Sequence, residues 1–186
     1  SQERKDWSKQ VIEVATIDNL DKTAINLARE KYKEKMNQEH ISKEVDEMTD
    51  EEFLTKVKLL IGGKVTNAGM LLLGSADYDY LMTSAPSIMW RLYGADGSDK
   101  DYEIFKIPFI NVVDKVFSKV RNLTYRYMPN QLTLFPMETE QYNSWLIREL
   151  LNNCIAHTNY QLGGRIKLNL QTLEILFRKR LKMYWK

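Results

Sequence analysis

Three polar residues at helical spacing are the part of this sequence best suited to chemistry. Glu149, Asn153 and His157 follow one another at steps of four residues. Four residues turn an α-helix by about 400°, so the three side chains form a single stripe that drifts by only about 40° at each step. The apolar residues around them are Trp145, Leu146, Ile147, Leu150, Leu151, Cys154 and Ile155. We therefore expect Trp145, Leu146, Leu150 and Leu151 to be buried and the stripe to line a pocket or a polar seam in a core.

A carboxylate and an amide one helical turn apart can act together on a nucleotide. The carboxylate of Glu149 can orient or deprotonate a water molecule. The amide oxygen of Asn153 can bind Mg²⁺, which keeps several waters and takes further ligands from phosphate groups. The same two residues can instead satisfy backbone groups or face solvent, as polar residues on many helices do. The residue types alone leave both interpretations open.

Residues 148–160, which read Arg-Glu-Leu-Leu-Asn-Asn-Cys-Ile-Ala-His-Thr-Asn-Tyr, resemble a known helix motif. The motif, RELLxNAxxHRDY, belongs to the RecG-related, ATP-dependent DNA helicase C-terminal-like family, whose last domain is a divergent GHKL ATPase. The resemblance implies that Glu149 is the catalytic general base. It also implies that Asn153 binds the nucleotide and its metal ion, and that His157 belongs to the cofactor-binding residues. ATP and Mg²⁺ are thus implied as cofactors by the resemblance.

The resemblance covers nearly the whole chain. Further matching segments are Asp-Trp-Ser at 6–8, residues 15–21 with Ala24, Ala28 and Arg29, residues 51–54, and residues 63–74. Two parts of the family pattern have no counterpart, namely the N-terminal AlbA-type DNA-binding domain and the glycine-containing loop expected after residues 173–175. The resemblance therefore implies a fragment of a RecG-related transcriptional regulator that reaches DNA through the missing N-terminal domain. We expect no catalysis by this chain itself.

A second class of function remains open beside the ATP-binding regulator. A chain that kept the fold and lost nucleotide binding would serve as a non-catalytic interaction platform for a protein partner or for a second copy of itself. The missing glycine loop favours this alternative, whereas Glu149 and Asn153 favour the regulator. A helicase motor is not expected, because residues 62–66 lack the first glycine and the hydroxyl residue of a P-loop.

Composition and charge restrict the class of protein, its cellular location and its possible partners. A chain of 186 residues with 44% hydrophobic residues can bury a real core. Cys154 is the single cysteine and cannot form an internal disulfide, and no apolar run approaches the length of a membrane span, so we expect a cytoplasmic protein with no membrane partner. The net charge is +2, yet the last nine residues contain five basic ones, Arg178, Lys179, Arg180, Lys182 and Lys186. With Tyr184 and Trp185 this tail could bind single-stranded nucleic acid, or it could simply be solvated.

The hydrophobic patterns predict an α+β fold in which N-terminal helices precede a mixed, mainly antiparallel sheet with packed helices. Helices are expected from a cap at Asp18 or Asp21 to about Met36, from the capping box at 49–52 to Gly62-Gly63, at 67–73, after Pro108 and through the motif. A mobile loop is expected at 36–48. Strands are expected at 88–92, 102–107, 123–128, 132–135, 165–170 and 173–177. We divide the chain into a helical segment 1–62, a central α+β region 63–137, and a partial GHKL-like α/β segment 138–186.

Overall fold

The computed structural model describes residues 6–94, 96–119, 124–127, 137–140, 144–171 and 182–185. The chain forms an α+β fold, as the sequence predicts, and divides into two compact units. Unit 1 comprises residues 1–87, 105–112 and 159–165, and unit 2 comprises residues 88–104, 113–158 and 166–186. Each unit combines segments that are far apart in the sequence. The boundaries expected at residues 62 and 137 stay predictions.

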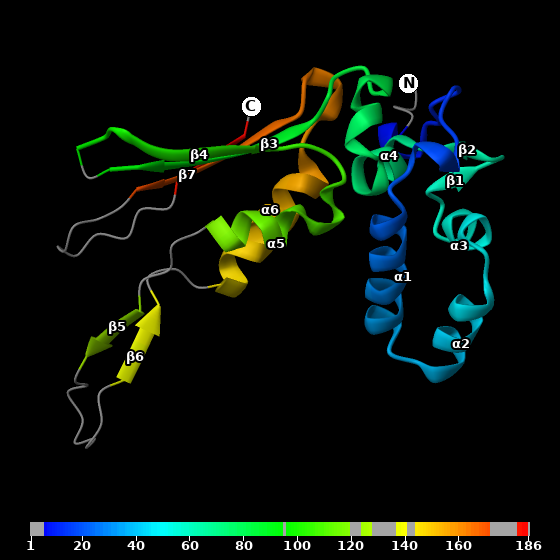
Figure 1. The fold of residues 1–186 in the computed structure, drawn as a ribbon, viewed down its shortest axis with the longest axis horizontal. Coiled ribbons are helices and arrows are strands. Elements are labelled where there is room, and N and C mark those ends of the chain that lie inside the picture. Colours follow the sequence, from blue (N-terminus) through cyan, green and yellow to red (C-terminus); the bar gives the residue numbers. More distant parts are fainter. Residues whose placement is uncertain are drawn as a thin grey trace, which may run out of the picture. The chain divides into compact units, whose positions relative to one another are not determined.

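Unit 1 is mainly helical (Figure 1). Its α-helices are α1 (Lys22–Met36), α2 (Glu39–Glu47), α3 (Asp50–Lys56) and α4 (Asn67–Leu73). Two short strands, β1 (Leu60–Ile61) and β2 (Lys64–Val65), form an antiparallel pair. The short 3-10 helices are η1 (Trp7–Lys9), η2 (Ile17–Asn19), η3 (Ala76–Leu81), η4 (Phe109–Asn111) and η5 (Tyr160–Leu162). The core side chains include Ile25, Phe53, Leu54, Met70 and Phe109.

Side-chain caps explain where two of these helices begin. Asp21 precedes α1, and its Oδ1 accepts a hydrogen bond from the Ala24 amide at 2.7 Å. Thr49 precedes α3, where the Glu52 amide donates to Thr49 Oγ1 at 3.2 Å and the Thr49 amide donates to Glu52 Oε2 at 2.8 Å. These bonds satisfy amide groups that have no partner within the first turn of a helix. Of the two caps expected for the first helix, Asp21 is the one used, and the capping box at Thr49 is confirmed.

The prediction that the helix starting at the capping box 49–52 ends at Gly62-Gly63 is wrong. Helix α3 ends earlier, at Lys56, and the two glycines form the turn between β1 and β2. Their φ values of 58° and 76° are those of a two-residue hairpin turn that glycine adopts without strain. Residues 64–73 then continue as strand β2 and helix α4, in agreement with the short helix expected at 67–73.

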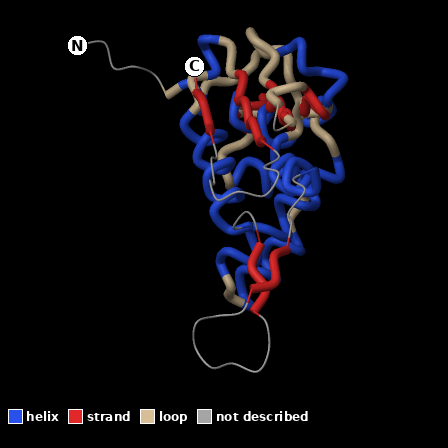
Figure 2. Tube along the Cα trace, turned by 90° about the vertical axis from the view of Figure 1, so that its left-hand side faces the viewer, coloured by secondary structure: helices blue, strands red, loops and turns tan. Residues whose placement is uncertain are grey.

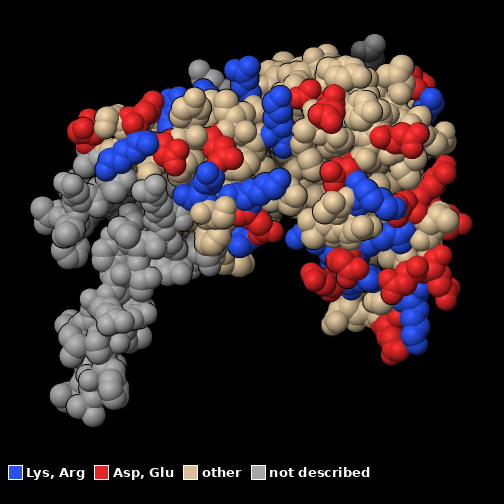
Figure 3. Space-filling view, viewed as in Figure 1, with Lys and Arg blue, Asp and Glu red and all other residues tan. Residues whose placement is uncertain are grey.

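The stretch 36–48, predicted to be a mobile loop, instead contains α2. Only Val45 of this helix is buried, so burial of apolar side chains contributes little to its stability. The helix is stabilised from outside itself. Lys33 of α1 forms an ion pair with Asp46 at 2.8 Å, and Lys56 of α3 forms another with Glu44 at 2.6 Å. Acidic and basic side chains are accordingly intermixed over this helical part in Figure 3.

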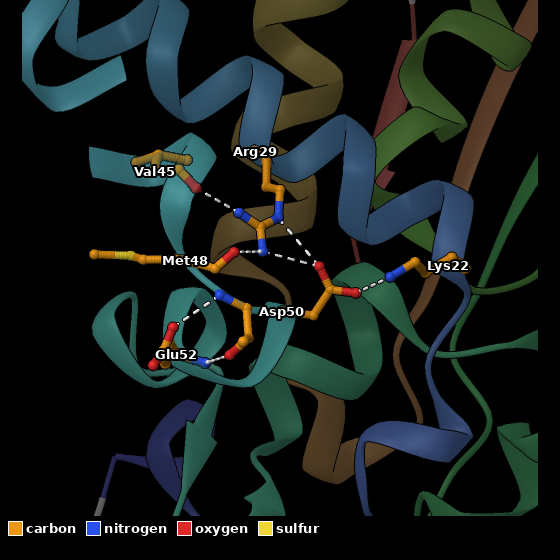
Figure 4. Close-up of polar contacts among 7 residues, drawn as sticks. Lys22, Arg29, Val45, Met48, Asp50 and Glu52 are labelled. Carbon is orange, nitrogen blue, oxygen red and sulfur yellow. Dashed lines mark hydrogen bonds and ion pairs between the residues drawn. The ribbon is translucent and has the colours of Figure 1, made fainter. Parts of the chain in front are cut away.

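Arg29 connects these helices through hydrogen bonds to α2 and α3 (Figure 4). Its Nη1 donates to the Val45 carbonyl at 2.6 Å and its Nη2 to the Met48 carbonyl at 2.8 Å, which satisfies the C-terminal end of α2. Nη2 also donates to Asp50 Oδ1 at 2.9 Å, and Nε donates to the same oxygen at 3.2 Å. The guanidinium carbon lies 5.0 Å from the centre of the Phe53 ring. Arg29 therefore joins α1, the end of α2 and the start of α3.

Most of the sheet lies in unit 2. Its four-stranded sheet has the order β4-β3-β7-β8, with strands β3 (Ser87–Tyr93), β4 (Asp99–Phe105), β7 (Arg165–Gln171) and β8 (Lys182–Trp185). The helices are α5 (Val112–Lys119) and α6 (Ser144–His157). A separate antiparallel pair consists of β5 (Thr124–Tyr127) and β6 (Met137–Glu140), drawn as two strands in Figure 2. Within the described residues, no helix has the length and apolar character needed to cross a membrane.

Several predicted strands are confirmed, and others change partner. The strands expected at 88–92, 102–107 and 165–170 correspond to β3, β4 and β7. The strand expected at 123–128 is β5, but it pairs with Met137–Glu140, while the expected partner at 132–135 lies outside the described residues. The strand expected at 173–177 also lies outside them. Strand β8, which no pattern predicted, is antiparallel to β7.

Replacing Asp50 with Asn should destabilise unit 1. Burial acts to raise the pKa of Asp50, but the hydrogen bonds donated by Lys22 and Arg29 outweigh it and lower the pKa below the ordinary value of an aspartate. Asp50→Asn should reduce the free energy of unfolding at neutral pH by about 1–3 kcal/mol, because it leaves the largely buried Arg29 without its anionic partner.

The matched control is Glu51→Gln, which removes a carboxylate from the same first turn of α3 at an exposed position. Urea unfolding of the three proteins compares them. Since the folded state lowers the pKa of Asp50, its contribution is present above the unfolded pKa and is lost as the pH falls through the folded one. The gap between parent and Asp50→Asn should therefore close in acid. An equal effect of the two substitutions would contradict this role.

Candidate functional site

The polar stripe of the motif lies on α6, and it is exposed. Glu149, Asn153 and His157 all belong to the solvent-accessible side of the helix. Asn153 Nδ2 donates a hydrogen bond to Glu149 Oε1 at 3.3 Å, so the carboxylate and the amide do meet across one turn. His157 is the last residue of the helix. The predicted alignment of Glu149 with Asn153 is confirmed. The expected polar seam in a core is wrong because the stripe is exposed, and a pocket around the stripe stays a prediction.

The buried side of α6 is narrower than its apolar content indicates. Ile147, Leu151, Cys154 and Ile155 are buried, at the spacing of one helix face. Trp145 and Leu146, which we expected to be buried, are 69% and 45% exposed. They lie outside the buried stripe, because residues one or two positions from Ile147 point about 100° or 200° away from it. Leu150 is half-buried. The prediction is thus confirmed for Leu151 and wrong for Trp145 and Leu146.

Helix α6 is held against α5 by its arginine. Arg148 forms an ion pair with Asp114, and its guanidinium carbon lies 4.6 Å from the centre of the Phe117 ring. Helix α5 is joined in turn to the sheet, because Lys119 forms an ion pair with Glu103 of β4 at 2.6 Å. Figure 1 shows both helices along the same side of the sheet. The neighbour of Glu149 in the sequence is therefore used to pack the helices.

The donor set around α6 matches a magnesium nucleotide only in part. Asn153 Oδ1 and the Glu149 carboxylate are oxygen ligands of the kind that Mg²⁺ accepts. The described residues contain no cluster of three or more His, Cys, Asp or Glu side chains that could hold a metal ion. The glycines that precede β7 do not form a phosphate cradle either, since a Cβ at Gly164 would collide with the Tyr160 ring. The described residues do not make up a complete nucleotide site.

Tyr160, the last residue of the motif, has a structural position in unit 1. Its side chain is only 6% exposed, and its ring stacks on Trp7 with a centroid distance of 5.2 Å and an interplanar angle of 20°. Asn67 at the start of α4 donates through Nδ2 to the Trp7 carbonyl at 3.0 Å. The Asp-Trp-Ser segment and the end of the motif, which lie far apart in the sequence, therefore meet in space. The sequence alone contained no signal for this contact.

Comparison with known proteins connects the chain to a family of unknown function and to a solved fold. Residues 1–83 match the family described as "Domain of unknown function (DUF8451)". No curated protein matches the sequence. The fold is similar to the crystal structure of the DIP2311 protein from Corynebacterium diphtheriae, with a TM-score of 0.65 and 19% identity over 91% of this chain. The chain spans 31% of that chain. At this identity the likeness concerns the fold alone.

Leucine-to-alanine substitutions should separate the two sides of α6. Leu151 is fully buried, so Leu151→Ala should lower the free energy of unfolding by about 2–5 kcal/mol through lost transfer energy and a cavity. Leu146→Ala makes the same chemical change at an exposed position and should cost less than about 1 kcal/mol. Urea unfolding monitored by circular dichroism measures both. Equal losses would show that α6 buries a different face.

Cys154 should react slowly in the folded chain. Its side chain is 8% exposed, and burial raises the pKa of the thiol. Since the thiolate is the reactive species, both effects reduce alkylation. A maleimide should label the native protein slowly near neutral pH and the urea-unfolded protein rapidly. Equal labelling rates in the two states would show that the buried face of α6 opens readily.

Proposed function

We propose that this chain is part of a RecG-related, ATP-binding transcriptional regulator, and that the exposed face of α6 is the remnant of its GHKL-like nucleotide site. The observation that carries the proposal is the pairing of Glu149 with Asn153, one turn apart and 3.3 Å between side chains, on a solvent-accessible face. The order Glu-x-x-x-Asn is that of the helix the sequence resembles. In the longer protein, an N-terminal domain would contact DNA, in the cytoplasm.

The proposal assigns nucleotide binding to the regulator and no hydrolysis to this chain. A general base needs a water molecule held in line with the phosphate, in a site that excludes bulk solvent. Glu149 is exposed to solvent, and the described residues contain no group of three or more His, Cys, Asp or Glu side chains that could hold a metal ion. Mg²⁺ bound with ATP would supply electrostatic stabilisation of the phosphates, and Asn153 would hold it through Oδ1. His157 would lie at the rim of the same face.

A non-catalytic interaction platform is the second candidate, and the start of α6 favours it. Trp145 is 69% exposed and Leu146 is 45% exposed, next to Glu149 on the same helix. Tryptophan is enriched among the residues that contribute most to protein interfaces. In this alternative the outer face of α6 binds a protein partner or a second copy of the chain, and the polar stripe supplies the rim of the interface.

Two neighbouring asparagines allow a controlled test of the nucleotide site. Millimolar Mg²⁺-ATP should shift the backbone amide resonances of α6 in NMR spectra of the parent chain. Asn153→Ala should abolish these shifts because it removes the proposed metal ligand. Asn152→Ala should preserve them, since Asn152 is also exposed but points about 100° away. The shifts should also depend on Mg²⁺.

Calorimetry and phosphate release complete the test. We expect a dissociation constant for Mg²⁺-ATP weaker than about 10 μM, which corresponds to about −7 kcal/mol, and no release of phosphate. Tighter binding with turnover would contradict a non-catalytic chain. Absence of any ATP-dependent shift on α6 would contradict the nucleotide proposal. In that case Trp145→Ala should be compared with the parent by sedimentation to test the platform.

A further inference from the structure

The sheet of unit 2 has one buried face and one open face. In β3 the side chains of Ile88, Trp90 and Leu92 are buried, whereas those of Arg91 and Tyr93 are partly exposed. In β7 Ile166 and Leu168 are buried, and Lys167 between them is exposed. Successive side chains of a strand point to opposite faces. Arg91, Tyr93 and Lys167 therefore lie on the open face of two neighbouring strands.

Arg91 and Tyr93 contact each other on this face through a hydrogen bond and a cation–π interaction. Arg91 Nη1 donates to Tyr93 Oη at 3.2 Å, and the guanidinium carbon lies 5.8 Å from the centre of the Tyr93 ring. The Asp99 carboxylate lies 3.8 Å from Arg91 Nε, at the end of β4, and offsets part of the charge there. Both planar groups are held in place by these contacts. They offer a prearranged surface for stacking at a low cost in side-chain entropy.

Lys167 of β7 adds a second basic side chain to the face that holds Arg91. Within the described part of the chain, Lys167 has no ion-pair partner. Strand β8 pairs with β7 so that Tyr184 is opposite Lys167 and Lys182 is opposite Asn169. Lys182–Trp185, which are part of the basic segment near the C-terminus, thus form the outer strand of this sheet.

We propose that the open face of β3 and β7, formed by Arg91, Tyr93 and Lys167, binds single-stranded nucleic acid. Basic side chains at a sheet face attract the phosphate backbone, and aromatic rings beside them stack on unpaired bases. The rings favour a single strand over a duplex, whose bases are stacked on one another. Binding is independent of base sequence, weakens with salt, and does not involve Glu149 or the outer face of α6. The proposal is therefore separate from the nucleotide site.

Fluorescence anisotropy with a labelled oligothymidylate tests the proposal. Lys167→Glu should weaken binding by about fivefold or more, and Lys167→Gln should make the salt dependence shallower by about 0.7 in slope, as expected for one lost phosphate contact. Tyr93→Leu should weaken binding by about fivefold or more through lost stacking. The matched control is Lys43→Glu on α2, where the lysine side chain is 72% exposed, and it should change binding by less than about twofold.

Circular dichroism melts of each variant establish that the fold is retained, and Lys167→Gln avoids the added negative charge. Three outcomes would overturn the proposal. The parent chain could fail to bind the oligothymidylate at micromolar concentration in low salt. Lys167→Glu and Lys43→Glu could weaken binding equally, which would show an effect of net charge. A duplex of the same length could bind as tightly as the single strand, which would show that the rings do not stack on bases.

Discussion

The Arg29 guanidinium is the contact on which the helical arrangement of unit 1 depends. Its side chain is only 13% exposed, so each of its donors must find an acceptor within the protein. The acceptors are the carbonyls at the end of α2 and the Asp50 carboxylate at the start of α3. One buried cation therefore binds the end of α2 and the start of α3, and it attaches both helices to α1. Helix α2, with a single buried residue, relies on such external contacts to form.

In unit 2, helix α6 and the sheet each have one face buried in the core and one face exposed to solvent. Helix α6 uses Ile147, Leu151, Cys154 and Ile155 to join the core, which leaves its other side for the polar stripe and for Trp145. The sheet likewise uses alternate residues of β3 and β7 for the core. The same secondary structure thus stabilises the unit and presents two independent surfaces. A ligand on α6 and a ligand on the open sheet face would not compete for the same residues.

The candidate site was predictable from the sequence in its residues but not in its surroundings. The i, i+4 spacing of Glu149 and Asn153 requires only the geometry of an α-helix, and the 3.3 Å hydrogen bond confirms it. Exposure was not predictable from the number of apolar neighbours, since Trp145 and Leu146 fall outside the buried stripe. The chemical roles of Glu149, Asn153 and His157 stay predictions. The burial of Tyr160 against Trp7 was not predictable from spacing at all, because the two residues are far apart in the sequence.

The sequence by itself determined the features that depend on local physics. The capping box at Thr49, the Asp21 cap, the strands β3, β4 and β7, and the α+β class follow from hydrogen bonds and periodicities within a few residues. Only the tertiary structure decided the features that depend on distant partners. Helix α2 forms because Arg29 and Lys33 bind its carbonyl and carboxylate oxygens. Lys182–Trp185 become strand β8 because β7 supplies the hydrogen-bonding partner. In both cases the stabilising groups lie beyond any local window of sequence, so no pattern in the segment itself could reveal them.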